Sequence, residues 1–132
     1  YSNKTGAQQF LELYNSLKDN FVVRSLWLQI TSPVDWIPHI DENTNFIDSI
    51  ISTAQTYGVS VGIYTNSYDW QQITNNWTGA TNCPLWYWNV FGSGPSGETS
   101  SNFYDFHPFS SWTSPVAKQF GQLEQVCGST VN

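Results

Sequence analysis

Three segments of the chain carry apolar side chains at the three- and four-residue spacing of an amphipathic helix. Residues 5–18 form the first, and residues 43–57 form the second, which Gly58 would end as a C-terminal glycine. Residues 67–74 form a shorter third segment. This spacing predicts three helices, each with one apolar face to bury against a neighbouring layer.

Between and after these helices, short runs of β-branched, aromatic and aliphatic residues predict strands. The predicted strands cover residues 21–30, 59–65, 85–91 and 116–120, with the start of a fifth at residues 129–132. Strands that alternate with helices at these lengths are typical of a parallel sheet covered by helices. The sequence therefore predicts an α/β fold.

The first predicted strand has two different faces, because successive side chains of a strand point in opposite directions. One face carries Leu26, Leu28 and Ile30, and the other carries Trp27, Gln29 and Thr31. We expect the aliphatic face to lie under the helices. A buried amide without a hydrogen-bond partner is costly, so Gln29 must be paired or must face a site.

Length and charge narrow the class of protein. With 132 residues, of which 39% are hydrophobic, the chain predicts one domain over residues 1–132. The formal net charge of −6 argues against nucleic acid and anionic membrane surfaces as partners, since both require a basic footprint. No apolar run has the length of a membrane span.

Two further features favour a secreted protein. The triplets that begin at Asn3 and at Asn76 both fit the N-glycosylation sequon. Cys83 and Cys127 are the two cysteines of the chain. A disulfide between them is one interpretation, and the alternative is that each is free or pairs outside this chain.

Cofactor motifs are not supported. Residues 92–97 match the spacing of a dinucleotide-binding loop, but Pro95 and the polar residues after it do not open an apolar helix. His39 and His107 stand apart in predicted loops, which is not metal-ligand spacing. We therefore expect no cofactor and no metal.

Polar side chains gather where the predicted strands end. Ligands of parallel α/β sheets bind at the carboxyl ends of strands, and these ends carry Gln29, Thr31, Thr65, Asn66, Asn89 and Gln119. Tryptophans lie beside them, and the chain has seven in all. One interpretation is that the aromatic rings only fill the core. The alternative, which we favour, is a groove for a neutral, hydroxyl-rich ligand such as a sugar.

Five stretches together resemble a known family. VRSLWLQITSP, VGIYTNSYDWQQIT, PLWYWNVFGSGPSGET, NFYDFHPFSSW and PVAKQFG are similar to the lysozyme-like proteins of nematodes, a branch related to the glycoside hydrolase family 25 muramidases. The resemblance covers nearly the whole chain. It implies a (β/α) barrel, secretion or a lysosomal-type compartment, a role in antibacterial innate immunity, and peptidoglycan as the target.

The resemblance also shows a difference at the expected catalytic position. The family strand that SLWLQIT resembles ends in Asp-x-Glu, and this chain has Gln29 and Thr31 there. Thr130 stands where the final family strand carries an acid, whereas Trp86 and Gln119 match family positions. Glycoside hydrolysis normally requires two carboxyl groups, so the resemblance implies a pseudoenzyme in which catalysis is weak or lost.

Three hypotheses follow. In the first, the chain is a secreted defence protein that binds cell-wall glycan. In the second, it is an active muramidase that uses other carboxylates, for which the candidates are Asp35, Asp69, Glu98 and Asp105. The third is a structural remnant without a ligand.

The chain is short for a complete barrel, which typically needs ~250 residues. The match begins after the third family strand, so we expect a truncated TIM-type (β/α) barrel with parallel strands, outer helices and no counterpart of the first three strands. The oligomeric state stays open, and no catalytic residue is assigned. The expected substrate-binding residues are Trp27, Gln29, Thr31, Tyr64, Asn66, Asp69, Trp86, Trp88, Asn89 and Gln119.

Overall fold

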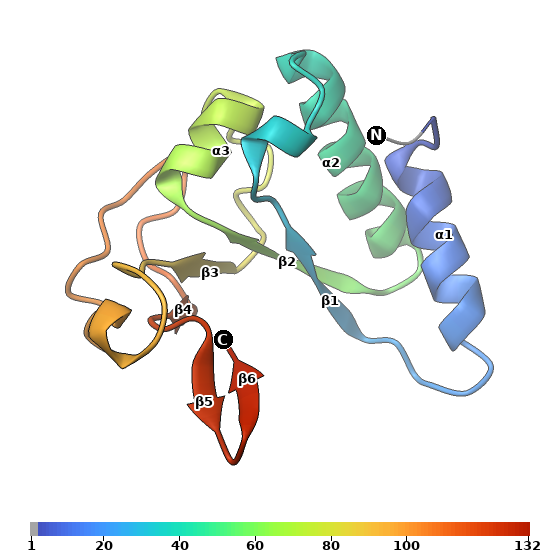
Figure 1. Ribbon diagram of the computed structural model, residues 1–132. Helices are drawn as coiled ribbons and strands as arrows, with labels where there is room; N and C mark the ends of the chain where they lie inside the picture. The colour runs from blue at the N-terminus through green and yellow to red at the C-terminus, as the bar shows by residue number, and fades with distance from the viewer. Residues whose placement is uncertain (1–2) are drawn as a thin grey trace.

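The computed structural model describes residues 3–132, in which helices and strands alternate through the first two thirds of the chain (Figure 1). The helices are α1 (Gly6–Leu17), α2 (Ile40–Thr56) and α3 (Ser67–Thr74). The strands are β1 (Ser25–Gln29), β2 (Ser60–Thr65), β3 (Leu85–Trp88), β4 (Ala117–Gln119), β5 (Glu124–Val126) and β6 (Ser129–Val131). Two short 3₁₀ turns, η1 (Pro33–Asp35) and η2 (Pro95–Gly97), lie in the connections.

Four strands form one parallel sheet in the order β1-β2-β3-β4. The register pairs Trp27 with Gly62, and Trp88 with Gln119. Because paired residues in adjacent strands share a face, this register continues the face of Trp27 across the sheet. The predicted α/β class with parallel strands between helices is confirmed.

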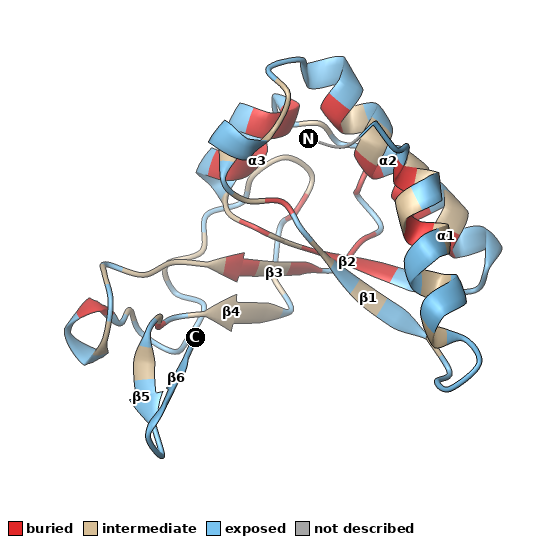
Figure 2. Cartoon of the chain, turned by 45° about the vertical axis from the view of Figure 1, so that its right-hand side comes forward, coloured by how far each residue is buried: buried red, intermediate tan, exposed pale blue. Residues whose placement is uncertain are grey.

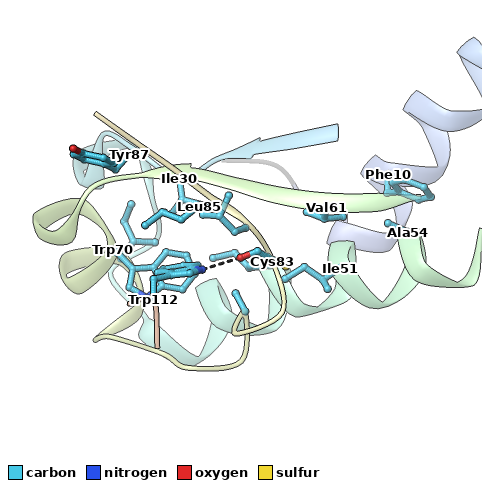
Figure 3. Close-up of a cluster of buried hydrophobic side chains, with 14 of the residues drawn as sticks. Phe10, Ile30, Ile51, Ala54, Val61, Trp70, Cys83, Leu85, Tyr87 and Trp112 are labelled. Atoms are coloured by element: carbon cyan, nitrogen blue, oxygen red, sulfur yellow. Dashed lines mark hydrogen bonds between the residues drawn. The ribbon is translucent and has the colours of Figure 1, made fainter. Parts of the chain in front are cut away.

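The three helices cover one face of this sheet (Figure 1). Buried residues lie on the three helices and on β2 and β3, whereas the residues of β1, β4 and the β5–β6 hairpin are exposed or half-buried (Figure 2). The core includes Ile30, Trp70, Leu85 and Trp112, and the indole of Trp112 donates a hydrogen bond of 2.8 Å to the carbonyl of Cys83 (Figure 3). No helix of residues 3–132 covers the opposite face of the sheet (Figure 1).

Local sequence signals explain the helix ends. Thr5 and Gln8 form a capping box at the start of α1. At the end of α2, Gly58 has a φ of 71°, and the N–H of Val59 donates to the carbonyl of Ala54. This is the glycine-terminated ending that the sequence predicts. α2 begins three residues earlier than predicted, with Asp41 in its first turn, where a negative charge is favourable.

The chain end differs from the prediction. Residues 129–132 were expected to begin a further strand of the parallel sheet, but β6 pairs antiparallel with β5 in a separate two-stranded sheet. Cys127 and Gly128 form the two-residue connection, and both have a positive φ, of 50° and 79°. Two such residues are typical of a tight hairpin turn, which sends the chain back on itself.

The structure decides between the two interpretations of the cysteines. Cys83 is buried and Cys127 is exposed in the hairpin turn, and both are free thiols, so they form no disulfide with each other. The predicted strands also extend too far: β1 does not include Phe21 or Val22, which are 65% and 80% exposed. Apolar side chains without a neighbouring strand or helix have nothing to pair or pack against, and propensity alone does not detect this.

Candidate functional site

A trough lies on the helix-free face of the sheet, with a volume of about 290 Å³. It is lined by Trp27 and Gln29 from β1, Tyr64 from β2, Trp86 from β3, Gln119 from β4, and Asn132 at the chain end. Each of the four parallel strands therefore contributes at least one side chain. Five of the ten residues expected to bind substrate line this trough.

The trough forms because strand alternation sends its side chains to one face. In β3, Leu85 and Tyr87 are buried towards the helices, while Trp86 and Trp88 are half-buried on the other side. In β2, Gly62 makes room for Trp27, because a Cβ built on this glycine would lie 2.4 Å from the indole ring. The ring of Trp27 can therefore lie directly over the backbone of β2.

Three aromatic rings make the apolar part of the trough. Trp27 meets Trp86 edge to face at a centroid distance of 5.7 Å. Tyr64 packs against Trp86 at 4.6 Å. These contacts hold the rings in place, so their orientation is set before any ligand arrives.

Neutral hydrogen-bonding groups surround the rings. The hydroxyl of Tyr64 donates to Oε1 of Gln119, and Nε2 of Gln119 donates to the carbonyl of Gly121 at 2.9 Å. Nε2 of Gln29 donates to Oγ1 of Thr31 at 2.9 Å. Gln29 is exposed, and within residues 3–132 its Oε1 accepts no hydrogen bond, so this oxygen is open to solvent.

Asn132 was missed at the sequence level. Its side-chain Oδ1 accepts a hydrogen bond of 2.9 Å from the backbone N–H of Leu123, which holds the end of the hairpin beside the trough. The glycine at position 128, after Cys127, was the available sequence signal for the hairpin turn. No spacing along the chain brings Asn132 next to Trp27.

Three expected site residues lie beside the trough rather than in its lining. Asn66 caps α3, and its side chain accepts the N–H of Asp69 at 2.7 Å. Asp69 is buried in the first turn of α3. Thr31 accepts from Gln29, and its carbonyl accepts the indole N–H of Trp36 at 3.0 Å.

The carboxyl group of Asp69 has a raised pKa. Burial raises its pKa above the ordinary value of 3.8, and the indole of Trp88 and the backbone N–H of Ser32 oppose this rise only in part. The buried indole N–H of Trp88 meets no acceptor at full hydrogen-bond geometry within the described residues, so its contact with Asp69 is weak. The pKa of Tyr64 is raised by burial and by the negative charge of Asp69. Asp69 is therefore coupled electrostatically to the trough.

Asn89 does not line the trough but binds Asp105 of the long loop after β3. Its Nδ2 donates to Asp105 at 2.5 Å, and the same carboxylate accepts from Tyr87 at 2.6 Å and from the buried ammonium of Lys118 at 2.9 Å. Burial opposes ionisation of Asp105, but these donors and the positive charge lower its pKa overall. This network ties residues 92–115, the long loop after β3, to the ends of β3 and β4.

None of the six side chains that line the trough carries a carboxyl group. Aromatic faces and neutral amides suit a ligand with hydroxyl groups and an apolar face, and none of the six lining side chains is a carboxylic acid that could protonate a leaving group. Within residues 3–132, no cluster of three or more His, Cys, Asp or Glu side chains could hold a metal ion. None of the helices described in the same range combines the length and apolar character needed to cross a bilayer.

Comparisons with known proteins point to one family. Residues 1–120 match the family described as Lysozyme-like protein 1. The chain is 50% identical to Lysozyme-like protein 7 of Caenorhabditis elegans, covering 99% of this chain and 47% of that protein. It is 51% identical to Lysozyme-like protein 2 of the same organism, covering 99% of this chain and 48% of that protein.

A more distant similarity connects the chain to glycoside hydrolases. It is 34% identical to Probable GH family 25 lysozyme 2 of Dictyostelium discoideum, over 93% of this chain and 55% of that protein. The chain thus spans about half the length of the curated relatives it matches. No solved structure matches it.

Proposed function

The chain belongs to the lysozyme-like protein family, which is related to the GH family 25 lysozymes, and on this premise we propose that it binds bacterial cell-wall glycan with weak or lost hydrolysis. The observation that carries the proposal is the composition of the trough. It combines three aromatic rings with neutral amides, and none of its six lining side chains carries a carboxyl group. Aromatic faces with a few fixed polar groups favour a sugar ligand, whereas proton transfer to a glycosidic oxygen requires an acid.

We extend the proposal to the complete fold, the target and the location of the protein. We place the four parallel strands and their helices in a (β/α) barrel of the TIM type, in which ligands bind at the carboxyl ends of the strands. The target is peptidoglycan, and the location is extracellular or a lysosomal-type compartment. Exposed sequons at Asn3 and Asn76 support passage through a secretory pathway.

The test is a binding measurement that uses the tryptophans of the trough. Chitin oligomers and soluble peptidoglycan fragments are titrated into the wild-type protein while tryptophan fluorescence is recorded. Replacing Gln29→Leu removes the ligand-facing carboxamide and should weaken binding about tenfold or more, with the melting temperature unchanged. Gln72→Leu, an exposed substitution on α3, is the matched control and should bind as the wild type does. Unchanged affinity in Gln29→Leu, or no binding by the wild type, would reject the trough as the glycan site.

A second candidate function is residual hydrolysis by Asp69. The supporting observation is a buried carboxyl with a raised pKa that acts electrostatically on Tyr64 of the trough. A protonated Asp69 would give its proton to the glycosidic oxygen as the C–O bond breaks. Water would then add its hydroxyl to the anomeric carbon and return a proton to the carboxylate.

This candidate is tested by the release of reducing ends from purified peptidoglycan. The wild type should release them slowly, and Asp69→Asn should reduce the rate about 100-fold while glycan binding persists. If the wild type binds glycan but releases nothing, hydrolysis is lost and only the binding function stands.

A further inference from the structure

A second and larger pocket lies on the helix side of the molecule, where α1, η1 and α2 begin. Its volume is about 620 Å³, against about 290 Å³ for the trough. In Figure 1 these three segments lie together near the N-terminus. We call it the α1–α2 pocket, and the residues of its lining that matter here are Gln9, Asp35, Trp36, Glu42, Asn45 and Phe46.

Two aromatic rings give this pocket a fixed apolar wall. Trp36 meets Phe46 edge to face at a centroid distance of 5.9 Å, and both are half-buried. The indole N–H of Trp36 donates to the carbonyl of Thr31 at 3.0 Å. This bond holds the indole in one orientation, as an aromatic binding surface requires.

The charge of the pocket is negative. Asp35 and Glu42 both line it and are exposed. The two ion pairs of the described residues join other groups, Lys4 with Glu12 and Lys118 with Asp105. Lys4 also lines the pocket, and its ammonium lies 2.8 Å from the carboxylate of Glu12.

Carboxylates beside tryptophan and phenylalanine rings favour a particular ligand chemistry. An alkylammonium group gains from the negative charges and from the faces of the rings, and its aliphatic chain can lie on the apolar wall. Anionic ligands are disfavoured by the same charges. The amides of Gln9 and Asn45 add donors and acceptors that suit a peptide backbone.

Thr31 joins this pocket to the trough. Its hydroxyl accepts the carboxamide of Gln29, which lines the trough, and its carbonyl accepts the indole of Trp36, which lines the pocket. We propose that the α1–α2 pocket binds the ammonium-bearing side chain of the peptide stem that peptidoglycan carries on its glycan. The assignment of this ligand rests on the proposed glycan-binding function, and it extends recognition from the sugar to the peptide.

The test uses a capped peptide stem whose only charge is the ε-ammonium of its lysine, titrated by calorimetry or by NMR. Acetylating that lysine, or combining Asp35→Asn with Glu42→Gln, should weaken binding about tenfold or more. Added salt should weaken the wild-type complex as well. Asp48→Asn, an exposed acid of α2 outside the pocket lining, is the matched control and should leave affinity unchanged.

Variants can distinguish the glycan-binding trough from the α1–α2 pocket. Gln29→Leu should weaken chitin-oligomer binding and leave peptide binding intact, and the Asp35 and Glu42 variant should do the reverse. No binding of the charged peptide, equal binding of the acetylated peptide, or unchanged affinity in the double variant would overturn the proposal. None of these results bears on glycan binding in the trough, which the chitin-oligomer titration tests separately.

Discussion

At the scale of single residues, similar side chains have different tasks according to their surroundings. Gln29 presents its carboxamide to the trough, whereas Asn89 is bound to Asp105 and holds the long loop. Asp69 is buried with a raised pKa, and Asp105 has a lowered pKa because three donors and the charge of Lys118 outweigh its burial. Residue type alone does not distinguish these cases.

The raised pKa of Asp69 predicts that the stability of the fold depends on pH. Its folded-state pKa lies above the ordinary 3.8, so the folded protein binds this proton more tightly than the unfolded chain. The stabilisation is therefore present at pH values below the ordinary pKa, and it is lost as the pH rises through the raised value. Asp69→Asn should remove this loss, so the variant should gain stability relative to the wild type as the pH rises above the ordinary pKa of 3.8.

Thermal melts across this pH range check the prediction. Asp19→Asn, an exposed substitution after α1, is the control and should follow the wild-type curve. If the difference between wild type and Asp69→Asn is constant with pH, the carboxyl does not titrate as described.

At the scale of elements, the contact between α1 and α2 depends on one small residue. Gly6 lies at the start of α1, and a Cβ built on it would be 2.2 Å from the carbonyl oxygen of Phe46 and 2.8 Å from the side chain of Ile50. The first of these atoms belongs to the backbone of α2, so it cannot move aside as a flexible side chain would. The helices approach this closely only because Gly6 has no side chain.

Gly6→Ala should therefore lower the free energy of unfolding by roughly 1–3 kcal/mol, despite the better helix propensity of alanine. Chemical denaturation measures this loss. Gly92→Ala is the control, because the nearest atom to its Cβ would be 4.0 Å away, and it should have little effect. Equal stability of Gly6→Ala and the wild type would mean that α1 and α2 are less closely packed than the structure describes.

At the scale of the whole molecule, the sheet divides the protein into a helix side and an open side. The core and the α1–α2 pocket lie on the helix side, and the trough lies on the other. The hairpin β5–β6 pairs with itself and still brings Asn132 to the trough. The two cysteines are distributed accordingly, Cys83 in the core and Cys127 in the exposed hairpin turn.

This distribution predicts two classes of thiol. In the native protein, Cys127 should react rapidly with a thiol reagent such as DTNB. Cys83 should react only after denaturation, because it is buried and burial raises its pKa, which reduces the reactive thiolate. If two thiols per chain react with DTNB after denaturation without reductant, the result agrees with the structure. No reactive thiol under either condition would restore the disulfide that the structure excludes.

Local periodicity was sufficient to predict the three helices, the parallel α/β class and the Gly58 helix end. It also separated Trp27 and Gln29 from the aliphatic face of β1. These features depend on residues within about one turn or one strand of each other. Backbone geometry and side-chain burial act there at short range, so the pattern of apolar and polar positions carries the information.

Only the tertiary structure decided which polar residues line the trough and which support the fold. It brought Asn132 beside Trp27, bound Asn89 to Asp105, buried Asp69, and turned residues 129–131 into half of a hairpin. Each outcome depends on a partner that is distant in sequence or on the exposure left after packing. An amide or carboxyl has the same local pattern in either role, and its function is set by the neighbours that the folded chain provides.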